Sequence, residues 1–566
     1  MLPAIFGCIK VTSRCFLFGL SLLAFLKLVQ PTYGEAPRLA LAIVTDQFRH
    51  NYLDRFEPYF SENGFRRLPA SRTNFEDCHS RHDVTKTSPG HATISSGVYA
   101  EVHGIVANER VDPMTWRVIE SNEDHEFPLV CASPRVGHLP GGVLEAKGGR
   151  SPSNFPATTV GDQLMLRFGS SPRVFSVAHK DRSTILMAGK LADSAYWIVD
   201  GRIVTSTYYR DQLPDWIEEF NAGGRADKIF GQTWGHLLAP TVYDAVQGSD
   251  DAPGENTDFG FGRTMPKQLD GGAAEITAKF YEAFETTPAA SAMIGEFASL
   301  AFKKEQLGQH AHTDLLCVGF SRIDKMGHAD GPDSHELMDS IVRLDGLIAK
   351  LLDTIDREAG LQNCVVVFTA HHGASPLPEH VRALRGMIPT GRLDKVALDA
   401  ACTAALYREF RPAPNDDYWC LRDDFGYHLR PSVLNAKNVS LADAAEVARQ
   451  ALLSRPEIAQ AFTSAEVLAT TAEGNSLGAR SRRSFFTGPI QDMVFVLKPH
   501  FIDRPETGTN HGSPYDYDSH VPLLWFGAGV PADRRNERVG VDDLAPTFAA
   551  LLGVPTPPQA IGRRLF

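Results

Sequence analysis

Short apolar runs rich in β-branched residues recur along the chain, and most of them stop abruptly at polar residues. Runs of four to eight such residues are typical of strands that are buried on both faces of a mostly parallel sheet. We expect strands in "LALAIVTD" (39–46), "RVFSVAHKD" (173–181), "LLCVGFSRID" (315–324), "CVVVFTAHH" (364–372), "MVFVLKPH" (493–500) and "VPLLWFG" (521–527).

The clearest helical pattern lies at 333–358, between two of these runs. Its apolar residues recur at alternating steps of four and three positions, which places them on one face of a helix. They are Leu337, Ile341, Leu344, Ile348, Leu351 and Ile355. Asp333 and Glu336 fit a capping box at the start of this helix. Strands that alternate with helices predict an α/β fold with a mostly parallel central sheet flanked by helices.

The segments at about 110–300 and 385–490 show no regular alternation and are rich in Pro, Gly and Arg. We interpret them as insertions into one domain that spans 35–566. Of the 566 residues, 43% are hydrophobic and 22% are charged, as in globular proteins. The net charge of −12 argues against nucleic-acid partners and against an anionic membrane surface. It does not exclude an anionic substrate, because a local cationic site can outweigh the global field.

The N-terminus has the order of a secretory signal. Lys10 and Arg14 precede the apolar run at 15–29, and small residues then lead to a predicted cleavage site after Gly34. We therefore expect residues 1–34 to be a signal peptide of a periplasmic or secreted protein, with no other stable membrane association. An uncleaved anchor is the alternative. In an oxidising compartment, Cys402 and Cys420 are the candidate disulfide pair.

Carboxylates and imidazoles follow several of the predicted strands. Open α/β sheets place their functional sites at the carboxyl ends of strands, and this mixture of oxygen and nitrogen donors suits zinc. Singly, each residue is more often a capping aspartate or a histidine with an ordinary partner. Their repeated occurrence at strand ends favours one shared metal site. The residues are Asp46, Asp324, His328, His371, His372 and His511.

The segment "VTKTSPGHATISSG" (84–97) reads as the start of a helix, because Pro89 is favoured in the first helical turn. A hydroxyl on Thr87 would lie in the positive end of the helix field, which stabilises an alkoxide or a phosphoryl oxygen. The alternative is that Thr87 or Ser88 simply caps the helix. The segment alone leaves both interpretations open.

Taken together, these motifs resemble the alkaline phosphatase superfamily, and within it the bacterial phosphatases with a threonine nucleophile. The related branch is the type I phosphodiesterases and nucleotide pyrophosphatases. The resemblance covers nearly the whole chain after the predicted signal. The motifs that carry it are "TSPGHATISSG", "HGIVANE", "HKDRSTILMAG", "DKMGHADGP", "HHG" and "GTNHGSPYDYDSHVPLL".

The resemblance implies two zinc ions. One zinc ion is expected at Asp324, His328 and His511. The other is expected at Asp46, the Thr87 oxygen, His371 and His372. Such a metal pair stabilises both the attacking and the leaving oxygen of a phosphoryl transfer, and Thr87 would form a phosphothreonine intermediate.

The resemblance also implies that Asn108, Lys180 and Arg182 contact the phosphoryl oxygens. Two cations and an amide suit a monoester dianion better than a diester. We therefore expect an exported phosphomonoesterase that acts on small phosphorylated substrates.

One position departs from the family pattern. The family usually has Asp-His-Gly after this strand, whereas the chain has His371, His372 and Gly373. Imidazole binds zinc, but the substitution removes a negative charge from the second metal site. Two alternatives therefore stay open: a phosphodiesterase or nucleotide pyrophosphatase of the same superfamily, and a catalytically impaired homologue.

Overall fold

The computed structural model describes residues 36–67, 72–131, 148–256, 260–414, 417–488, 491–504 and 506–566. The predicted signal peptide at 1–34 lies outside the described residues. Residues Pro37–Phe566 form one unit, and all that follows concerns that unit. No helix within the described ranges is both long and apolar enough to cross a membrane.

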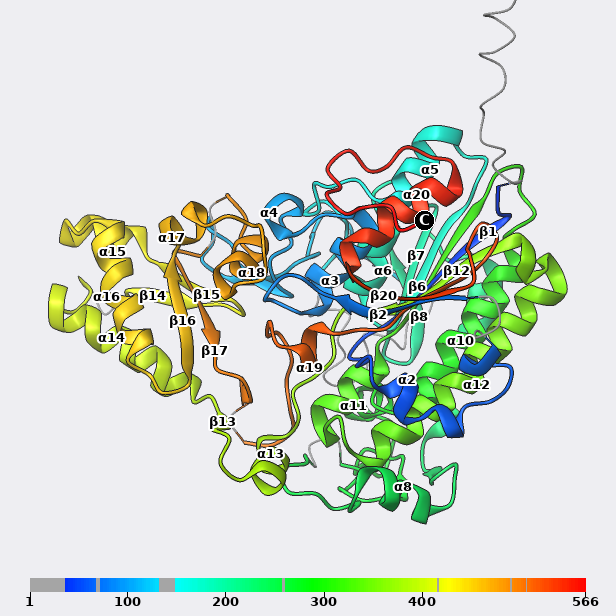
Figure 1. Ribbon diagram of the computed structural model, residues 1–566, viewed down its shortest axis with the longest axis horizontal. Coiled ribbons are helices and arrows are strands. Elements are labelled where there is room, and N and C mark those ends of the chain that lie inside the picture. The colour runs from blue at the N-terminus through cyan, green and yellow to red at the C-terminus, as the bar shows by residue number, and fades with distance from the viewer. Residues whose placement is uncertain are drawn as a thin grey trace, which may run out of the picture. The chain divides into compact units, whose positions relative to one another are not determined.

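A ten-stranded sheet runs through this unit (Figure 1). In spatial order its strands are β20 (Asp533–Gly540), β2 (Arg72–His79), β19 (Leu523–Gly527), β12 (Cys364–Ala370), β1 (Leu39–Thr45), β11 (Asp314–Phe320), β6 (Val174–Ala178), β7 (Ser194–Val199), β8 (Arg202–Ser206) and β5 (Leu129–Val130). The strands from β12 to β7 are all parallel to their neighbours within that block. Strand β19 is antiparallel to both of its neighbours. The predicted α/β fold with a mostly parallel central sheet is therefore confirmed.

Helices cover both faces of the sheet, and strand β7 shows how. Tyr196 faces α10 (Pro288–Lys304), where its ring centroid lies 5.8 Å from that of Phe297. The next residue, Trp197, packs in a different cluster with Ile185 of α6 (Asp181–Ala188). Because successive side chains of a strand point to opposite faces, α6 and α10 lie on opposite sides of the sheet.

Two groups of helices form these layers (Figure 1). The first contains α3 (Thr87–Ser96), α5 (Val160–Phe168), α6 and α20 (Leu544–Leu552). The second contains α10, α11 (Arg322–Asp330) and α12 (His335–Ala359). Strands buried between two helical layers have no solvent-facing side, which explains why their sequences are apolar without alternation.

The predicted helix at 333–358 is α12, but its start differs from the prediction. The N-cap residue is Ser334, whose side chain accepts a hydrogen bond from the Leu337 amide. Asp333 instead pairs with Arg55 at 2.7 Å, and Glu336 pairs with Lys267 at 2.9 Å. The expected capping box of Asp333 and Glu336 is therefore wrong, because distant cations bind both carboxylates.

A separate four-stranded sheet has the order β14 (Cys420–Arg422), β15 (Gly426–Leu429), β17 (Met493–Leu497) and β16 (Ile458–Thr463). Helices α14 (Lys395–Phe410), α15 (Pro431–Lys437) and α16 (Leu441–Leu453) share its core. Most of this substructure comes from the 385–490 segment, and the predicted strand at 493–500 completes it. The 110–300 segment, by contrast, supplies β5, β6, β7 and β8 to the main sheet.

Short elements complete the described chain. The two-stranded pairs are β3 (Glu109–Val111) with β4 (Val118–Glu120), β9 (Thr233–Trp234) with β10 (Lys267–Gln268), and β13 (Gly391–Arg392) with β18 (Phe501–Ile502). The remaining α-helices are α2 (Tyr52–Arg55), α4 (Ala100–His103), α7 (Asp215–Ala222), α8 (Pro240–Gln247), α9 (Ala278–Phe284), α13 (Pro378–Arg385), α17 (Ser464–Ala469), α18 (Leu477–Ser484) and α19 (Asp516–Ser519).

Cys402 and Cys420 are both free thiols, so the predicted disulfide between them is absent. Cys402 is fully buried in the core between the four-stranded sheet and its helices, and Cys420 packs against that core. Burial raises the pKa of both thiols to about 12. Both residues act as small apolar side chains.

Candidate active site at the carboxyl ends of the strands

Most of the polar residues that follow the central strands meet at one edge of the sheet. Asp46 comes directly after β1, and Asp324 lies in the first turn of α11 after β11. His371 and His372 follow β12, and Lys180 follows β6. These strands are parallel, so their carboxyl ends lie together, as in other open α/β sheets.

Thr87 is the first residue of α3, and Lys86 occupies the N-cap position without a side-chain cap. The Thr87 hydroxyl donates to Asp46 Oδ2 at 3.4 Å, and Lys180 Nζ lies 3.2 Å from Thr87 Oγ1. Thr87 is therefore not a helix cap. Its hydroxyl lies at the positive end of the helix dipole, beside a cation and a carboxylate.

Lys180 joins the two aspartates. Its ammonium lies 2.8 Å from Asp46 Oδ2 and 2.5 Å from Asp324 Oδ2. Burial raises the pKa of the Asp46 carboxyl, but Lys180 and His91 together outweigh burial and hold that pKa at about 2. Burial likewise opposes ionisation of Asp324, and Lys180 and His328 bring its pKa well below the ordinary value. Both carboxylates are therefore ionised at neutral pH.

Asp324, His328 and His511 form one group of converging ligand atoms. Asp324 Oδ1 lies 3.3 Å from His328 Nε2 and 3.2 Å from His511 Nε2. The other ring nitrogen of each histidine, Nδ1, donates to a backbone carbonyl, at 2.9 Å for His328 and 2.7 Å for His511. Such hydrogen bonds fix the ring orientation of metal-binding histidines and direct Nε2 into the site.

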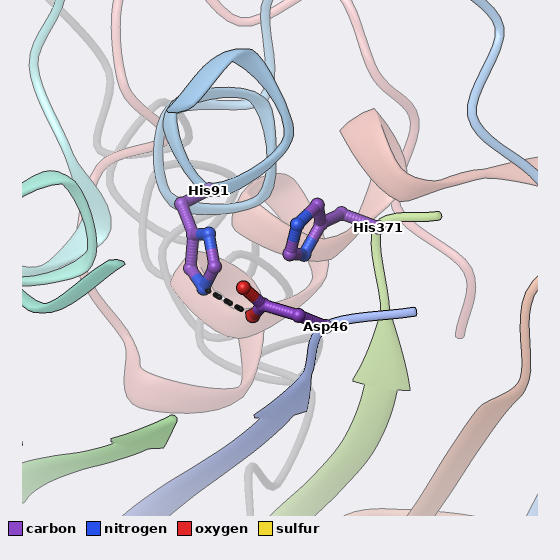
Figure 2. A group of neighbouring side chains, drawn as sticks. All are labelled: Asp46, His91 and His371. Atoms are coloured by element: carbon purple, nitrogen blue, oxygen red, sulfur yellow. Dashed lines mark ion pairs between the residues drawn. The ribbon is translucent and has the colours of Figure 1, made fainter. Parts of the chain in front are cut away.

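Asp46, His91 and His371 form a second group, whose ligand atoms lie within 4.8 Å of one another. Figure 2 shows the His91 and His371 rings on either side of the Asp46 carboxylate. His91 Nδ1 donates to the Thr87 carbonyl at 2.9 Å, and its Nε2 lies 3.9 Å from Asp46 Oδ1. His91 was not predicted from the sequence. Its position four residues after Thr87, on the same helical face, was the signal available.

His371 and His372 are fully buried, but their surroundings differ. His372 Nδ1 donates to the Gly373 carbonyl at 2.9 Å, and its ring stacks on His511 with centroids 3.6 Å apart. The His371 ring lies beside His91, with centroids 4.3 Å apart. Burial and neighbouring cationic or imidazole groups lower the pKa of both histidines well below the ordinary value, so both rings are neutral.

Several buried oxygen and nitrogen atoms at this site, all of types that can bind a metal, have no hydrogen-bond partner. They are Oδ1 of Asp46, Nε2 of His91, both ring nitrogens of His371, and Nε2 of His372. Buried polar atoms are rarely left unpaired in folded proteins. Neutral imidazoles and ionised carboxylates are the donors that zinc and similar divalent ions prefer. The residues present therefore fit a metal site.

The residues expected to bind phosphate line one cavity of about 400 Å³, which Lys180 connects to Thr87. Asn108 Oδ1 accepts a hydrogen bond from the Ser88 amide at 2.9 Å, which leaves its amide nitrogen as the free donor group. Arg182 Nε is buried and has no hydrogen-bond partner. The cationic and amide residues of the cavity are Lys86, Asn108, Arg150, Lys180, Arg182, Arg322 and Lys325.

Comparisons with known proteins identify the family and the fold. Residues 40–424 match the family described as type I phosphodiesterase / nucleotide pyrophosphatase. The chain is 30% identical over 545 residues to alkaline phosphatase PhoV of Synechococcus elongatus, covering 94% of this chain and 93% of that protein. It is 27% identical over 561 residues to alkaline phosphatase PafA of Elizabethkingia meningoseptica, covering 98% of each. The crystal structure of wild-type alkaline phosphatase PafA superposes with a TM-score of 0.85, at 27% identity, over 94% of this chain and 99% of that chain.

Proposed function

We propose that this chain, an alkaline phosphatase-type hydrolase that belongs to the type I phosphodiesterase / nucleotide pyrophosphatase family, is an exported phosphomonoesterase that acts through a phosphothreonine on Thr87. The observation that carries the proposal is the position of Thr87. Its Oγ1 lies 3.2 Å from Lys180 Nζ, and Lys180 also lines the cavity that holds Asn108 and Arg182. Export rests on the sequence at 1–34 alone.

Two divalent metal ions, most simply zinc, fit the donor atoms. Asp324, His328 and His511 would hold one ion. Asp46, Thr87, His371 and His372 would hold the other, and His91 adds a further donor to that set. When bound, such a pair supplies Lewis-acid stabilisation of the oxygens that enter and leave phosphorus.

The chain's own residues prepare Thr87 for attack. Asp46 Oδ2 accepts the hydrogen bond of the Thr87 hydroxyl, which directs the lone pairs of Oγ1 away from Asp46. Lys180 places a positive charge beside the oxygen on which negative charge develops. The hydroxyl proton leaves to solvent as a bond forms between Oγ1 and phosphorus. The bond from phosphorus to the leaving oxygen breaks, and this oxygen takes up a proton from solvent and departs as the alcohol. Water next attacks the phosphothreonine, the bond between phosphorus and Oγ1 breaks, and inorganic phosphate leaves.

Asn108, Lys180 and Arg182 would bind the oxygens of phosphorus that take no part in bond exchange. A phosphate monoester carries two negative charges on these oxygens, whereas a diester carries one. Two cations and an amide donor therefore favour the monoester in its transition state. Small phosphorylated molecules are the substrate class that this site suits.

Diester hydrolysis is the second candidate, because the matching family is itself described as phosphodiesterase and pyrophosphatase. A catalytically impaired protein is the third, because His371 brings no negative charge to the second metal. The buried donor atoms around His371 favour a working site over an impaired one.

Acid quenching during turnover tests the covalent step. The enzyme is quenched with acid while it hydrolyses a phosphate monoester. Peptide mapping of the quenched protein should then find phosphate on Thr87 and on no neighbouring hydroxyl residue. The Thr87→Ala variant should carry none, while the control Thr85→Ser should still be labelled at Thr87. Turnover without any labelled Thr87 peptide would contradict the mechanism.

A further inference from the structure

A third group of residues with the donor types of a metal site lies on elements other than those of the candidate active site. It consists of His236, Asp250 and His335, whose ligand atoms lie within 4.8 Å of one another. His236 lies between β9 and α8, Asp250 follows α8, and His335 is the first residue of α12. None of the motifs that indicated the active site includes these residues.

The donor atoms face each other at short range. His236 Nε2 lies 3.1 Å from His335 Nδ1, and Asp250 Oδ1 lies 3.2 Å from that same nitrogen. The imidazole of His335 is 1% exposed. Donor atoms from two other segments therefore converge on Nδ1 of a buried ring, which is the third donor.

The contacts of His335 with neighbouring residues fix the orientation of its ring. His335 Nε2 lies 2.8 Å from the Gly248 carbonyl, which accepts a hydrogen bond and cannot donate one. Nε2 therefore donates its proton to that carbonyl, and Nδ1 faces His236 Nε2 and Asp250 Oδ1. A histidine that donates one nitrogen to a carbonyl and turns the other towards further donors has the geometry of a metal ligand.

Asp250 presents an oxygen to the same side of the His335 ring. Asp250 Oδ1 is buried without a hydrogen-bond partner, while its Oδ2 accepts from the Met265 amide at 2.9 Å. The amide holds the carboxylate with Oδ1 directed at His335 Nδ1. A cation at this place would meet a carboxylate oxygen and two imidazole nitrogens, and the oxygen lies 3.2 Å from Nδ1.

The backbone around His236 is held independently of the three donors. Asp339 Oδ1 accepts from the Leu237 amide and from the Tyr243 hydroxyl, both at 2.7 Å. Asp339 Oδ2 accepts from Trp234 Nε1 at 2.8 Å. Because Asp339 lies one turn after His335 on α12, the same helix fixes both histidines, and the site is preorganised.

We propose that His236 Nε2, His335 Nδ1 and Asp250 Oδ1 bind a divalent transition-metal ion of the zinc class, with water as the remaining ligand. Two imidazoles and one carboxylate are a ligand set that zinc accepts. The ion would fasten the segment around α8 to the start of α12. That helix follows α11, which carries Asp324 and His328, so the ion would brace the region that holds one half of the active site.

The test measures zinc content in a full-length chain from which the carboxylates of the two proposed active-site metal positions have been removed. The background variant carries Asp46→Asn and Asp324→Asn, which weaken both proposed catalytic metal positions. This background variant is purified with zinc and dialysed, and its folding is checked by circular dichroism. Elemental analysis then compares its zinc content with and without the further change His236→Gln. His236→Gln should remove one zinc equivalent, and Asp250→Asn should raise the zinc dissociation constant at least tenfold.

His310→Gln is the matched control. His310 pairs with Asp314 at 2.7 Å, but it belongs to no three-donor group among the described residues. This variant should keep the full zinc content of its background. Equal zinc content in the folded His236→Gln, Asp250→Asn and control chains would overturn the proposal. Because the effect is a difference within one background, the outcome does not depend on the proposed phosphatase activity.

Discussion

Gly90 and His371 are in direct contact across the candidate active site. A Cβ atom at position 90 would lie 2.4 Å from His371 Cδ2 and 2.6 Å from His371 Cβ. The first turn of α3 therefore approaches the end of β12 as closely as it does because residue 90 has no side chain. The same contact places His371 beside His91 and opposite Asp46, as Figure 2 shows.

Gly90→Ala should displace His371 and lower the stability of the chain. A methyl group in this closely packed contact should cost about 1–3 kcal/mol, and it should reduce zinc content at the second metal position. Gly346→Ala is the matched control, because that helical glycine has open space around its Cβ position. Urea unfolding and elemental analysis measure the two effects. Equal stability for both variants would show that the contact does not constrain His371.

His371→Ala should remove about one zinc equivalent, because it deletes a buried ring whose nitrogens have no other partner. His371→Asp should retain that equivalent, since a carboxylate is also a zinc ligand. Elemental analysis of dialysed protein distinguishes these results, with the exposed His125→Gln as control. An unchanged zinc content in His371→Ala would show that His371 is not a ligand.

Arg182→Ala should lower kcat/KM for a phosphate monoester by roughly 10²-fold. The same change should lower diester turnover much less, because a diester has one fewer negative charge for the guanidinium to bind. Arg182→Lys should recover part of the loss. The control is Arg534→Ala, a side chain that is 72% exposed and lies outside the cavity. Equal losses for the two substrate classes would mean that Arg182 does not select the dianion.

Acid should destabilise the fold through His82 and His103. Burial and nearby groups, His103 and Arg480 above all, lower the pKa of His82 to about 3, and burial lowers that of His103 to about 3. In the unfolded chain both pKa values return to 6.5. The unfolded state therefore binds more protons below that pH, and stability falls as the pH drops.

The expected loss is about 1.4 kcal/mol per pH unit for each histidine, starting below pH 6.5. His82→Gln should reduce the slope of the unfolding free energy against pH by the contribution of one histidine, about 1.4 kcal/mol per pH unit. His125→Gln, at an exposed ring, should leave the slope unchanged. Denaturant unfolding between about pH 5 and pH 7 measures this. An unchanged slope in His82→Gln would show that this histidine titrates normally in the folded chain.

Much of the fold follows from local pattern. The apolar runs at 39–46, 315–324 and 364–372 became adjacent parallel strands, because each has apolar residues on both faces. The run at 493–500 has the same character, yet it pairs in the smaller sheet. Periodicity identifies a buried strand but carries no information about which sheet it joins, since that depends on long-range packing.

The site was predictable in part for the same reason. Asp46 and Asp324 follow predicted strands, and strand ends of a parallel sheet meet. His91 escaped notice because it lies inside a helix, where a single histidine is ordinarily a packed side chain. His236, Asp250 and His335 are far apart in the sequence and share no motif, so their convergence is visible only in the folded chain.

The central claim concerns a phosphomonoesterase whose nucleophile is Thr87. The most direct measurement compares hydrolysis of p-nitrophenyl phosphate with that of bis-p-nitrophenyl phosphate by zinc-loaded full-length protein, with Thr87→Ala as the blank. The account predicts faster monoester turnover, absent in the folded Thr87→Ala chain. A preference for the bis-ester, or monoester turnover that persists in Thr87→Ala, would contradict it.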